Sequence, residues 1–162
     1  MSPHIRAARA ADHAAITRII VPTIRAGETY ALDRDLGEAE ALAYWTGPDR
    51  ETFVAEEAGT VLGTYYLRAN QAGGGAHVAN CGFMTGEAAL GRGVARAMCA
   101  HALDRARARG FAAMQFNFVV SSNVRAVRLW ESFGFNVAGR LPGAFRHPTL
   151  GPVDALVMFR TL

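Results

Sequence analysis

The sequence predicts an α/β protein with one mixed sheet (an α+β arrangement) that carries helices on both faces. Short runs that alternate apolar and polar residues are typical of strands, and longer segments repeat apolar residues with helical spacing. Their order along the chain is β-α-α-β-β-β-α-β-α-β-β. The length of 162 residues fits one domain, and 51% apolar residues supply a sizeable core. We therefore expect residues 1–162 to form one domain.

The first half of the chain is predicted to hold four strands and two helices. The strands are expected at residues 4–8, 52–57, 61–68 and 77–85. One helix is expected after Asp12, with Ile16, Ile19 and Ile20 at helical spacing, and a second at residues 37–46. Asp12 is the expected N-cap of the first helix, and Pro22 is expected to interrupt or kink it. Residues 27–30 form a predicted loop, and the glycine-rich residues 69–76 form a second, mobile one.

The second half is predicted to begin with an amphipathic helix at residues 94–109, which Gly110 ends. A strand at residues 114–120 should point Met114, Phe116, Phe118 and Val120 to one face. A helix at residues 122–133 carries an apolar stripe. Strands at residues 135–140 and 154–162 are expected to close the sheet, joined by a Gly/Pro-rich loop.

Charge and cysteine content exclude several classes of protein. The net charge is +3, and the basic residues are all Arg and scattered along the chain, so a nucleic-acid partner is not expected. No apolar run approaches the ~20 residues of a membrane span, and the N-terminus lacks a signal-peptide pattern, so we expect a cytoplasmic protein. Cys81 and Cys99 lack metal-ligand spacing, so no metal site is predicted and both are expected in the core.

A glycine-rich turn leads into the helix that begins at Val94. Gly91 and Gly93 leave room for a ligand beside the main chain, and the first N–H groups of a helix lack intrahelical partners. The helix dipole adds positive charge there. Ala95 keeps the next position small, while Arg92 and Arg96 add charge. The turn fits a phosphate site, but it fits an ordinary helix entry too.

Two blocks of sequence resemble the Gcn5-related N-acetyltransferase (GNAT) family. Residues 83–95 are similar to its strand followed by a glycine turn and a long helix. Downstream, Asn123-Val124-Arg125-Ala126 and Leu129-Trp130-Glu131-Ser132-Phe133-Gly134-Phe135 are similar to its Asn-x-x-Ala block and closing Gly-Phe. The resemblance implies the GNAT fold and transfer of an acetyl group from acetyl-CoA to an amine.

The resemblance also implies a set of cofactor-binding residues. The main chain of the fourth strand would receive the pantetheine arm, the glycine turn the diphosphate, and Asn123 would touch the arm or cap its helix. This set consists of Phe83, Met84, Thr85, Gly91, Arg92, Gly93, Val94, Ala95, Arg96 and Asn123.

Three positions depart from the family pattern. Leu90 and Glu87 stand where Gln or Arg and Pro are usual, but main-chain binding of the diphosphate tolerates both changes. Trp130 stands where many members place a Tyr that protonates the departing thiolate. Trp has no acidic proton for this role. Because a thiol pKa is near ~8.5, the thiolate can leave without an acid.

The candidate catalytic residues are Asn80, Asn117, Glu28 and Tyr30. Asn is disfavoured inside strands, yet Asn80 and Asn117 fall in the two strands expected to flank the acyl group. They form either a buried amide pair or a contact with the acetyl carbonyl or the amine. An alkylamine has a pKa near ~10 and must lose a proton before it attacks. Glu28 and Tyr30, in the first loop, are candidates for that proton, with His77 and His147 as weaker ones.

The sequence leaves the acceptor open. The second block favours a small amine, such as an amino acid, an analogue or an amine toxin, which attacks the thioester directly. A protein N-terminus or lysine, and a non-catalytic acyl-CoA-binding module, are the alternatives. Residues 24–35 and 141–152 should decide between a lidded pocket and an open groove. Homodimers are common among relatives, and nothing in the residues decides for or against one here.

Overall fold

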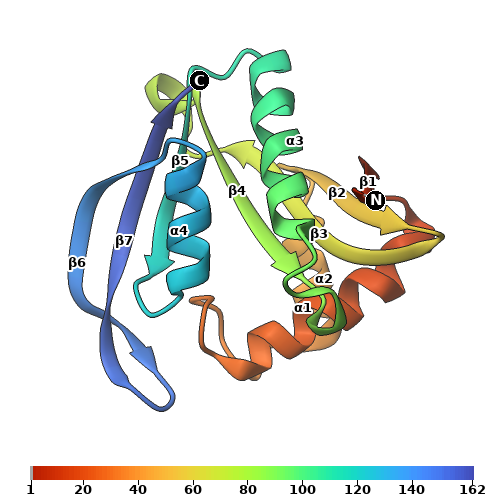
Figure 1. Ribbon diagram of the computed structural model, residues 1–162, viewed down its shortest axis with the longest axis horizontal. Helices are drawn as coiled ribbons and strands as arrows, with labels where there is room; N and C mark the ends of the chain where they lie inside the picture. The colour runs from red at the N-terminus through yellow and green to blue at the C-terminus, as the bar shows by residue number, and fades with distance from the viewer. Residues whose placement is uncertain (1) are drawn as a thin grey trace.

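The computed structural model describes residues 2–162 and shows a seven-stranded mixed sheet between two pairs of helices (Figure 1). The strands are β1 His4–Ala7, β2 Glu51–Glu57, β3 Thr60–Ala69, β4 Val78–Thr85, β5 Ala113–Val120, β6 Asn136–His147 and β7 Gly151–Thr161. The helices are α1 His13–Ala26, α2 Glu38–Trp45, α3 Val94–Ala108 and α4 Val124–Ser132, with short 3-10 turns η1 Ala10–Asp12, η2 Gly73–Gly75 and η3 Glu87–Ala89. The predicted element order and fold class are confirmed.

The sheet separates two hydrophobic cores. Helices α3 and α4 cover one face, where Met98 and Cys99 of α3 and Trp130 of α4 are buried. Helices α1 and α2 cover the other face with Ile16, Ile20 and Trp45. Alternate residues of the central strands enter each core, because successive strand side chains point to opposite faces. Each side of the sheet therefore has its own packed layer.

The strand order is β1-β2-β3-β4-β5-β7-β6, and β4 and β5 form the parallel pair while the other neighbours are antiparallel. Pairing of β4 with β5 is confined to Val78 with Ala113 and Ala79 with Met114. Figure 1 shows the two strands running together near the C-terminus and then moving apart. Beyond Ala79 the main chain of β4 therefore has an edge that no strand covers.

Aromatic side chains fill the α3/α4 side of this opening. The rings of Phe83 on β4 and Phe116 on β5 lie 6.0 Å apart, and each lies 5.0 Å from the Trp130 ring. The Trp130 ring therefore packs over the point where the two strands part.

The last two strands are longer than the sequence predicts. The Gly/Pro-rich residues 141–153 are not a loop, because β6 and β7 stay paired through Phe145 with Val153 and His147 with Gly151. An irregularity between Leu141 and Phe145 accommodates the intervening Pro and Gly. Phe145 is buried, which anchors the hairpin to the sheet.

The alternation predicted for β5 holds only in part. The pairing with β7 shifts between Phe116 and Val119, so Val119 rather than Phe118 joins Met114 and Phe116 in the core. The Phe118 ring contacts Phe145 instead, at 6.2 Å. A β-bulge of this kind re-aims side chains, and this one turns Phe118 toward the open part of β5.

Helix α1 differs from the expectation in two ways. Asp12 occupies the N-cap position, but its carboxylate makes no capping hydrogen bond; it accepts from Arg6 at 2.8 and 2.9 Å and from the Arg9 N–H at 2.7 Å. Those bonds hold the pKa of Asp12 down at about 2. Pro22 does not interrupt the helix, which continues to Ala26. No helix in residues 2–162 is long and apolar enough to cross a membrane.

Candidate functional site

A groove with a volume of about 1190 Å³ runs through the opening between β4 and β5. The N-terminal turn of α3 and one side of α4 border it on one face of the sheet. The loop between α1 and α2 and the outer part of β3 border it on the other. A single ligand-sized space therefore connects the two faces of the sheet.

The open edge of β4 presents its main chain to this groove. The Gly86 N–H donates to the Leu62 carbonyl of β3 at 2.8 Å, so even-numbered residues of β4 direct their main-chain groups to β3. Odd-numbered residues, Phe83 and Thr85 among them, face the groove. Phe83, Met84 and Thr85 were predicted to receive the pantetheine arm, but the main-chain groups of Met84 pair with β3. The Phe83 N–H and the main-chain groups of Thr85 are then available to an extended ligand.

Tyr30 reaches this edge from the loop between α1 and α2. Its hydroxyl donates to the Phe83 carbonyl at 3.0 Å, and its ring meets Trp45 edge-on at 6.0 Å. Burial raises the pKa of the Tyr30 phenol well above its usual value. The phenol therefore stays protonated and acts as a hydrogen-bond donor, which fits a positioning role and not that of a general base.

The turn before α3 has the geometry of an anion site. Gly91 and Gly93 adopt φ of 77° and 78°, a conformation that favours glycine. A Cβ on Gly93 would meet nothing within 4 Å, so the space beside it is open. The first intrahelical bond runs from Ala97 N–H to the Gly93 carbonyl at 3.0 Å. The N–H groups of Val94, Ala95 and Arg96 precede it and have no intrahelical acceptor.

The arginines around the turn have different surroundings. Arg92 forms an ion pair with Glu57 of β2 and does not line the groove, and its N–H donates to Ala89 at 3.3 Å. Arg96 does line it, with its guanidinium 5.3 Å from the Phe133 ring. Two further cations, Arg125 and Arg128 of α4, were missed by the sequence analysis and also line the groove.

These cations surround the open turn. Arg125 Nη2 lies 3.7 Å from where a Cβ on Gly91 would be, which places its charge beside the free N–H groups. Unpaired N–H groups, open space and three arginines fit the diphosphate of a coenzyme. Arg125 lies inside the Asn-x-x-Ala block, so its place in the first turn of α4 was the available sequence signal.

Helix α4 contributes two more groove residues. Asn123 is its N-cap, and the side-chain oxygen accepts from the Ala126 N–H at 3.4 Å. Trp130 is 8% exposed and forms a wall of the groove between Phe83 and Phe116. The Trp130 ring thus packs as an aromatic wedge at the point where the two strands part.

Asn80 and Asn117 both line the groove but do not pair with each other. Asn80 donates from Nδ2 to the Gln115 carbonyl of β5 at 2.9 Å, directly after the last paired residue of β4. Asn117 accepts from Gln115 Nε2 at 2.8 Å and donates to Asn70 Oδ1 at 2.6 Å. These bonds form an amide network across the α1/α2 side of the opening, and Asn80 Oδ1 has no partner in it among residues 2–162.

Tyr66 and Arg68 of β3, with Tyr44 of α2, extend this polar wall. A Cβ on Gly82 would lie 2.4 Å from the Tyr66 ring, so only glycine lets that ring lie across β4. Tyr44 meets Tyr66 edge-on at 6.3 Å, and Arg68 is directly opposite Asn80 in the pairing of β3 with β4. The sequence analysis missed all three side chains, because neither β-strand alternation nor helical spacing says which face will border a ligand.

The remaining candidates have simpler surroundings. Glu28 is an exposed carboxylate at the rim of the groove on the α1/α2 side. His77 and His147 do not line the groove, and His147 accepts hydrogen bonds within its own hairpin turn. Burial raises the pKa of Cys81 well above its usual value and that of Cys99 to about 12, so neither is a thiolate nucleophile.

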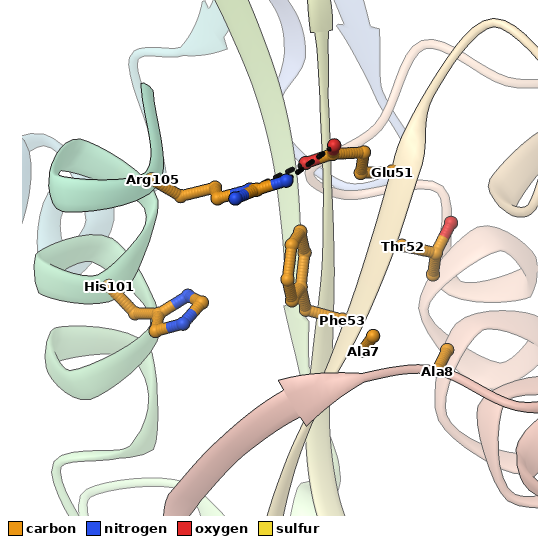
Figure 2. Close-up of a pocket in the computed structure, with 7 residues that line it drawn as sticks. All are labelled: Ala7, Ala8, Glu51, Thr52, Phe53, His101 and Arg105. Carbon is orange, nitrogen blue, oxygen red and sulfur yellow. Dashed lines mark hydrogen bonds and ion pairs between the residues drawn. The ribbon is translucent and has the colours of Figure 1, made fainter. Parts of the chain in front are cut away.

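A smaller hollow of about 540 Å³ lies elsewhere, between α3 and the strands β1 and β2 (Figure 2). Arg105 of α3 and Glu51 of β2 lie at one end of it and bind each other through two hydrogen bonds of 2.9 Å. His101 faces Phe53, and its Nδ1 is 2.6 Å from the Tyr65 hydroxyl. Its two charged residues bind each other, and His101 and Thr52 are hydrogen-bonded to Tyr65 and Trp45, which leaves the larger groove as the candidate site.

Comparison with known proteins agrees with this geometry. The sequence model described as the acetyltransferase (GNAT) family matches residues 12–135. N-acetyltransferase aca1 of Schizosaccharomyces pombe is 27% identical over 147 residues, which cover 81% of this chain and 70% of aca1.

Solved structures extend the comparison to the whole fold. A GCN5-related N-acetyltransferase from Kribbella flavida is 47% identical, with a TM-score of 0.94, covering 99% of this chain and 98% of that one. The yncA protein of Salmonella typhimurium, solved with its cofactor acetyl-CoA, is 26% identical, with a TM-score of 0.86, covering 100% and 95%. The chain belongs to the GNAT family of acetyltransferases.

Proposed function

We propose that this acetyl-CoA-dependent N-acetyltransferase, with residues 1–162 as one domain, transfers the acetyl group to the amine of a small molecule. The observation that carries the proposal is the single groove through the parted strands β4 and β5. One end holds the glycine turn and its arginines, and the other holds amides and phenols. Coenzyme and acceptor can therefore meet between the two strands without a covalent enzyme intermediate.

The chain binds the coenzyme through main-chain donors. N–H groups at the start of α3 receive the diphosphate, with Arg96, Arg125 and Arg128 beside them. Acetyl-CoA supplies a thioester that an amine can attack. The Phe83 N–H faces the groove and is placed to donate to the acetyl carbonyl oxygen as negative charge develops there. One such donor contributes about 3–4 kcal/mol in other acyl transfers.

Tyr30 and Asn80 prepare the region where attack occurs. The Tyr30 hydroxyl donates to the Phe83 carbonyl, which holds the Phe83 main chain and thereby orients the Phe83 N–H. Asn80 uses one N–H of its amide on Gln115 and keeps Oδ1 for an N–H of the incoming amine. Asn117, held at both ends of its amide, has one N–H left for the acceptor. The amine is then oriented with its lone pair toward the carbonyl carbon.

The loop between α1 and α2 favours a small acceptor over a protein segment. Arg34 Nε donates to the Arg25 carbonyl at 2.8 Å, which folds residues 25–34 back on themselves, and Tyr30 fastens the loop to β4. Leu32 of the same loop lines the groove, as does Tyr44 of α2. The acceptor side is therefore walled by the chain itself, as expected for a pocket that encloses a small molecule.

Thiol release from acetyl-CoA across a panel of amines tests the proposal. The panel contains free amino acids, simple alkylamines and peptides with free N-termini or lysines. We expect turnover with small amines and none with peptides. Turnover confined to peptides would contradict the small-molecule acceptor, and thiol release without any acetylated amine would contradict amine transfer.

Gly93→Glu should abolish coenzyme binding. The new carboxylate would enter the open space beside the turn and repel the diphosphate. Gly110→Glu is a matched control, since Gly110 has a φ of 82° at the far end of α3 and also has nothing within 4 Å of an added Cβ. Calorimetry with CoA should show binding by the control and none by Gly93→Glu. Equal affinity of both folded variants would contradict the assigned site.

Asn80→Ala should lower kcat/KM for the amine by about 10- to 100-fold, because one orienting hydrogen bond to a neutral group contributes about 1–3 kcal/mol when its loss leaves a buried partner unpaired. Asn136→Ala, at an exposed Asn of β6, is the control. Steady-state kinetics with each substrate varied in turn would measure the effect. A fall in acetyl-CoA affinity with an unchanged kcat would show that Asn80 only holds the strands together.

Glu28 is proposed to take the amine proton through water, because it is the acidic side chain on the acceptor side of the groove. Glu28→Gln should lower kcat/KM for the amine about tenfold or more near neutral pH. The deficit should shrink as pH approaches the pKa of the amine, near ~10, since the amine then arrives neutral. Glu40→Gln, exposed on α2, is the control. Superimposable pH profiles for wild type and Glu28→Gln would contradict the assignment.

A further inference from the structure

Arg68 stands out on the acceptor side of the groove because the protein leaves its guanidinium largely without partners. It lines the groove, its side chain is 28% exposed, and its nearest anion is Asp49, at 3.5 Å. It donates no hydrogen bond within the described part of the chain, and its Nε is buried without an acceptor. Its Nη groups supply the exposed part of a cation that faces the groove.

Asp49 does not fully neutralise this charge, because Arg50 binds the same carboxylate more closely. Arg50 donates to both oxygens, at 2.8 and 3.2 Å, and its side chain is only 7% exposed. The Arg50 guanidinium is also 5.0 and 4.7 Å from the Tyr44 and Tyr66 ring centres, so it lies behind the groove wall. Two cations share one carboxylate, which leaves about one uncompensated positive charge, and Arg68 is the exposed member of the pair.

The position of this charge relative to the amide network defines what it can bind. Arg68 and Asn80 are directly opposite each other in adjacent strands, with side chains on the same face. Neighbouring strands lie about 4.8 Å apart. A molecule whose amine meets Asn80 and whose anionic group meets Arg68 therefore lies across these two neighbouring strands, and an amino acid carries both groups on one small molecule.

We propose that Arg68 binds the carboxylate of the acceptor, so that the preferred substrates are free amino acids or close analogues and not simple alkylamines or peptide N-termini. This inference rests on the proposed function and makes it specific. Arg presents a planar fork of N–H donors that matches a carboxylate. The same positive charge disfavours a bound ammonium and favours the neutral amine that must attack. A peptide N-terminus has an amide in place of the carboxylate and would leave the guanidinium unpaired.

Matched pairs of free α-amino acids and their carboxamides test this assignment. A carboxamide has the same side chain and amine, and its amine has a lower pKa, so simple reactivity favours the amide. We expect the wild-type enzyme to prefer the acid by at least tenfold in kcat/KM. Arg68→Gln should remove this preference by raising KM for the acid at least tenfold, while KM for acetyl-CoA stays unchanged. Arg68→Lys should retain part of it, and Arg107→Gln, on the exposed side of α3, should behave as wild type.

Calorimetric titration of the amino acids into CoA-saturated protein reads carboxylate recognition without turnover. Binding of the acid that Arg68→Gln abolishes supports the inference even if no acetylation occurs, and in that case the proposed function alone fails. Turnover of acids and carboxamides at equal rates, or a preference that survives in Arg68→Gln, overturns the inference and leaves the proposed function standing.

Discussion

The parting of β4 from β5 is the constraint on which the rest of the molecule depends. A parallel pair normally continues for the length of its strands, yet this one stops after Ala79 and Met114. The side-chain amide of the next residue, Asn80, donates a hydrogen bond to the Gln115 carbonyl. An unpaired strand edge leaves main-chain groups without partners inside the protein, which is costly unless something satisfies them. Tyr30 satisfies one of them, and a bound ligand can satisfy the others.

The two faces of the sheet divide the work at this opening. On the α3/α4 face, glycines in left-handed conformations and the start of a long helix create a site for anions. On the α1/α2 face, phenols, amides and the guanidinium of Arg68 create a polar wall. In the proposed function both halves are needed, since the groups that orient the amine lie on the α1/α2 face and the coenzyme that carries the acetyl group binds on the other. Separate hydrophobic cores hold the helices on each face of the sheet, so both halves of the site are fixed beside the same opening.

The sequence predicted those features that local pattern controls. Helices α3 and α4 follow from apolar spacing, and the turn at Gly91 and Gly93 follows from residues that tolerate positive φ. The β6–β7 hairpin was missed because Pro and Gly suggest a loop, whereas pairing through Phe145 and Val153 carries the strands past them. The bulge in β5 was missed for the same reason, since it depends on the partner strand β7.

The acceptor side was the least predictable part of the site. Tyr30 and Phe83 are 53 residues apart, and no local signal predicts that a hydroxyl of one meets the carbonyl of the other. Arg68 looks like an ordinary charged residue at the end of a strand. Its significance appears only when Asp49 is seen to be occupied by Arg50. Charge balance of this kind is a property of three-dimensional neighbours and not of sequence spacing.

The presence of Trp130 indicates which proton transfer needs assistance from the protein. An indole cannot donate a proton to a departing thiolate, and this one is packed between Phe83 and Phe116 as a wedge. The thiolate of CoA is stable enough to leave without an acid, with a thiol pKa near ~8.5. The difficult requirement is then the amine, which is protonated at neutral pH and must arrive neutral. In the function proposed above, the positive charge of Arg68 and the Glu28 carboxylate at the rim both act on that step, so the acceptor side supplies the catalytic assistance that a proton donor on α4 does not.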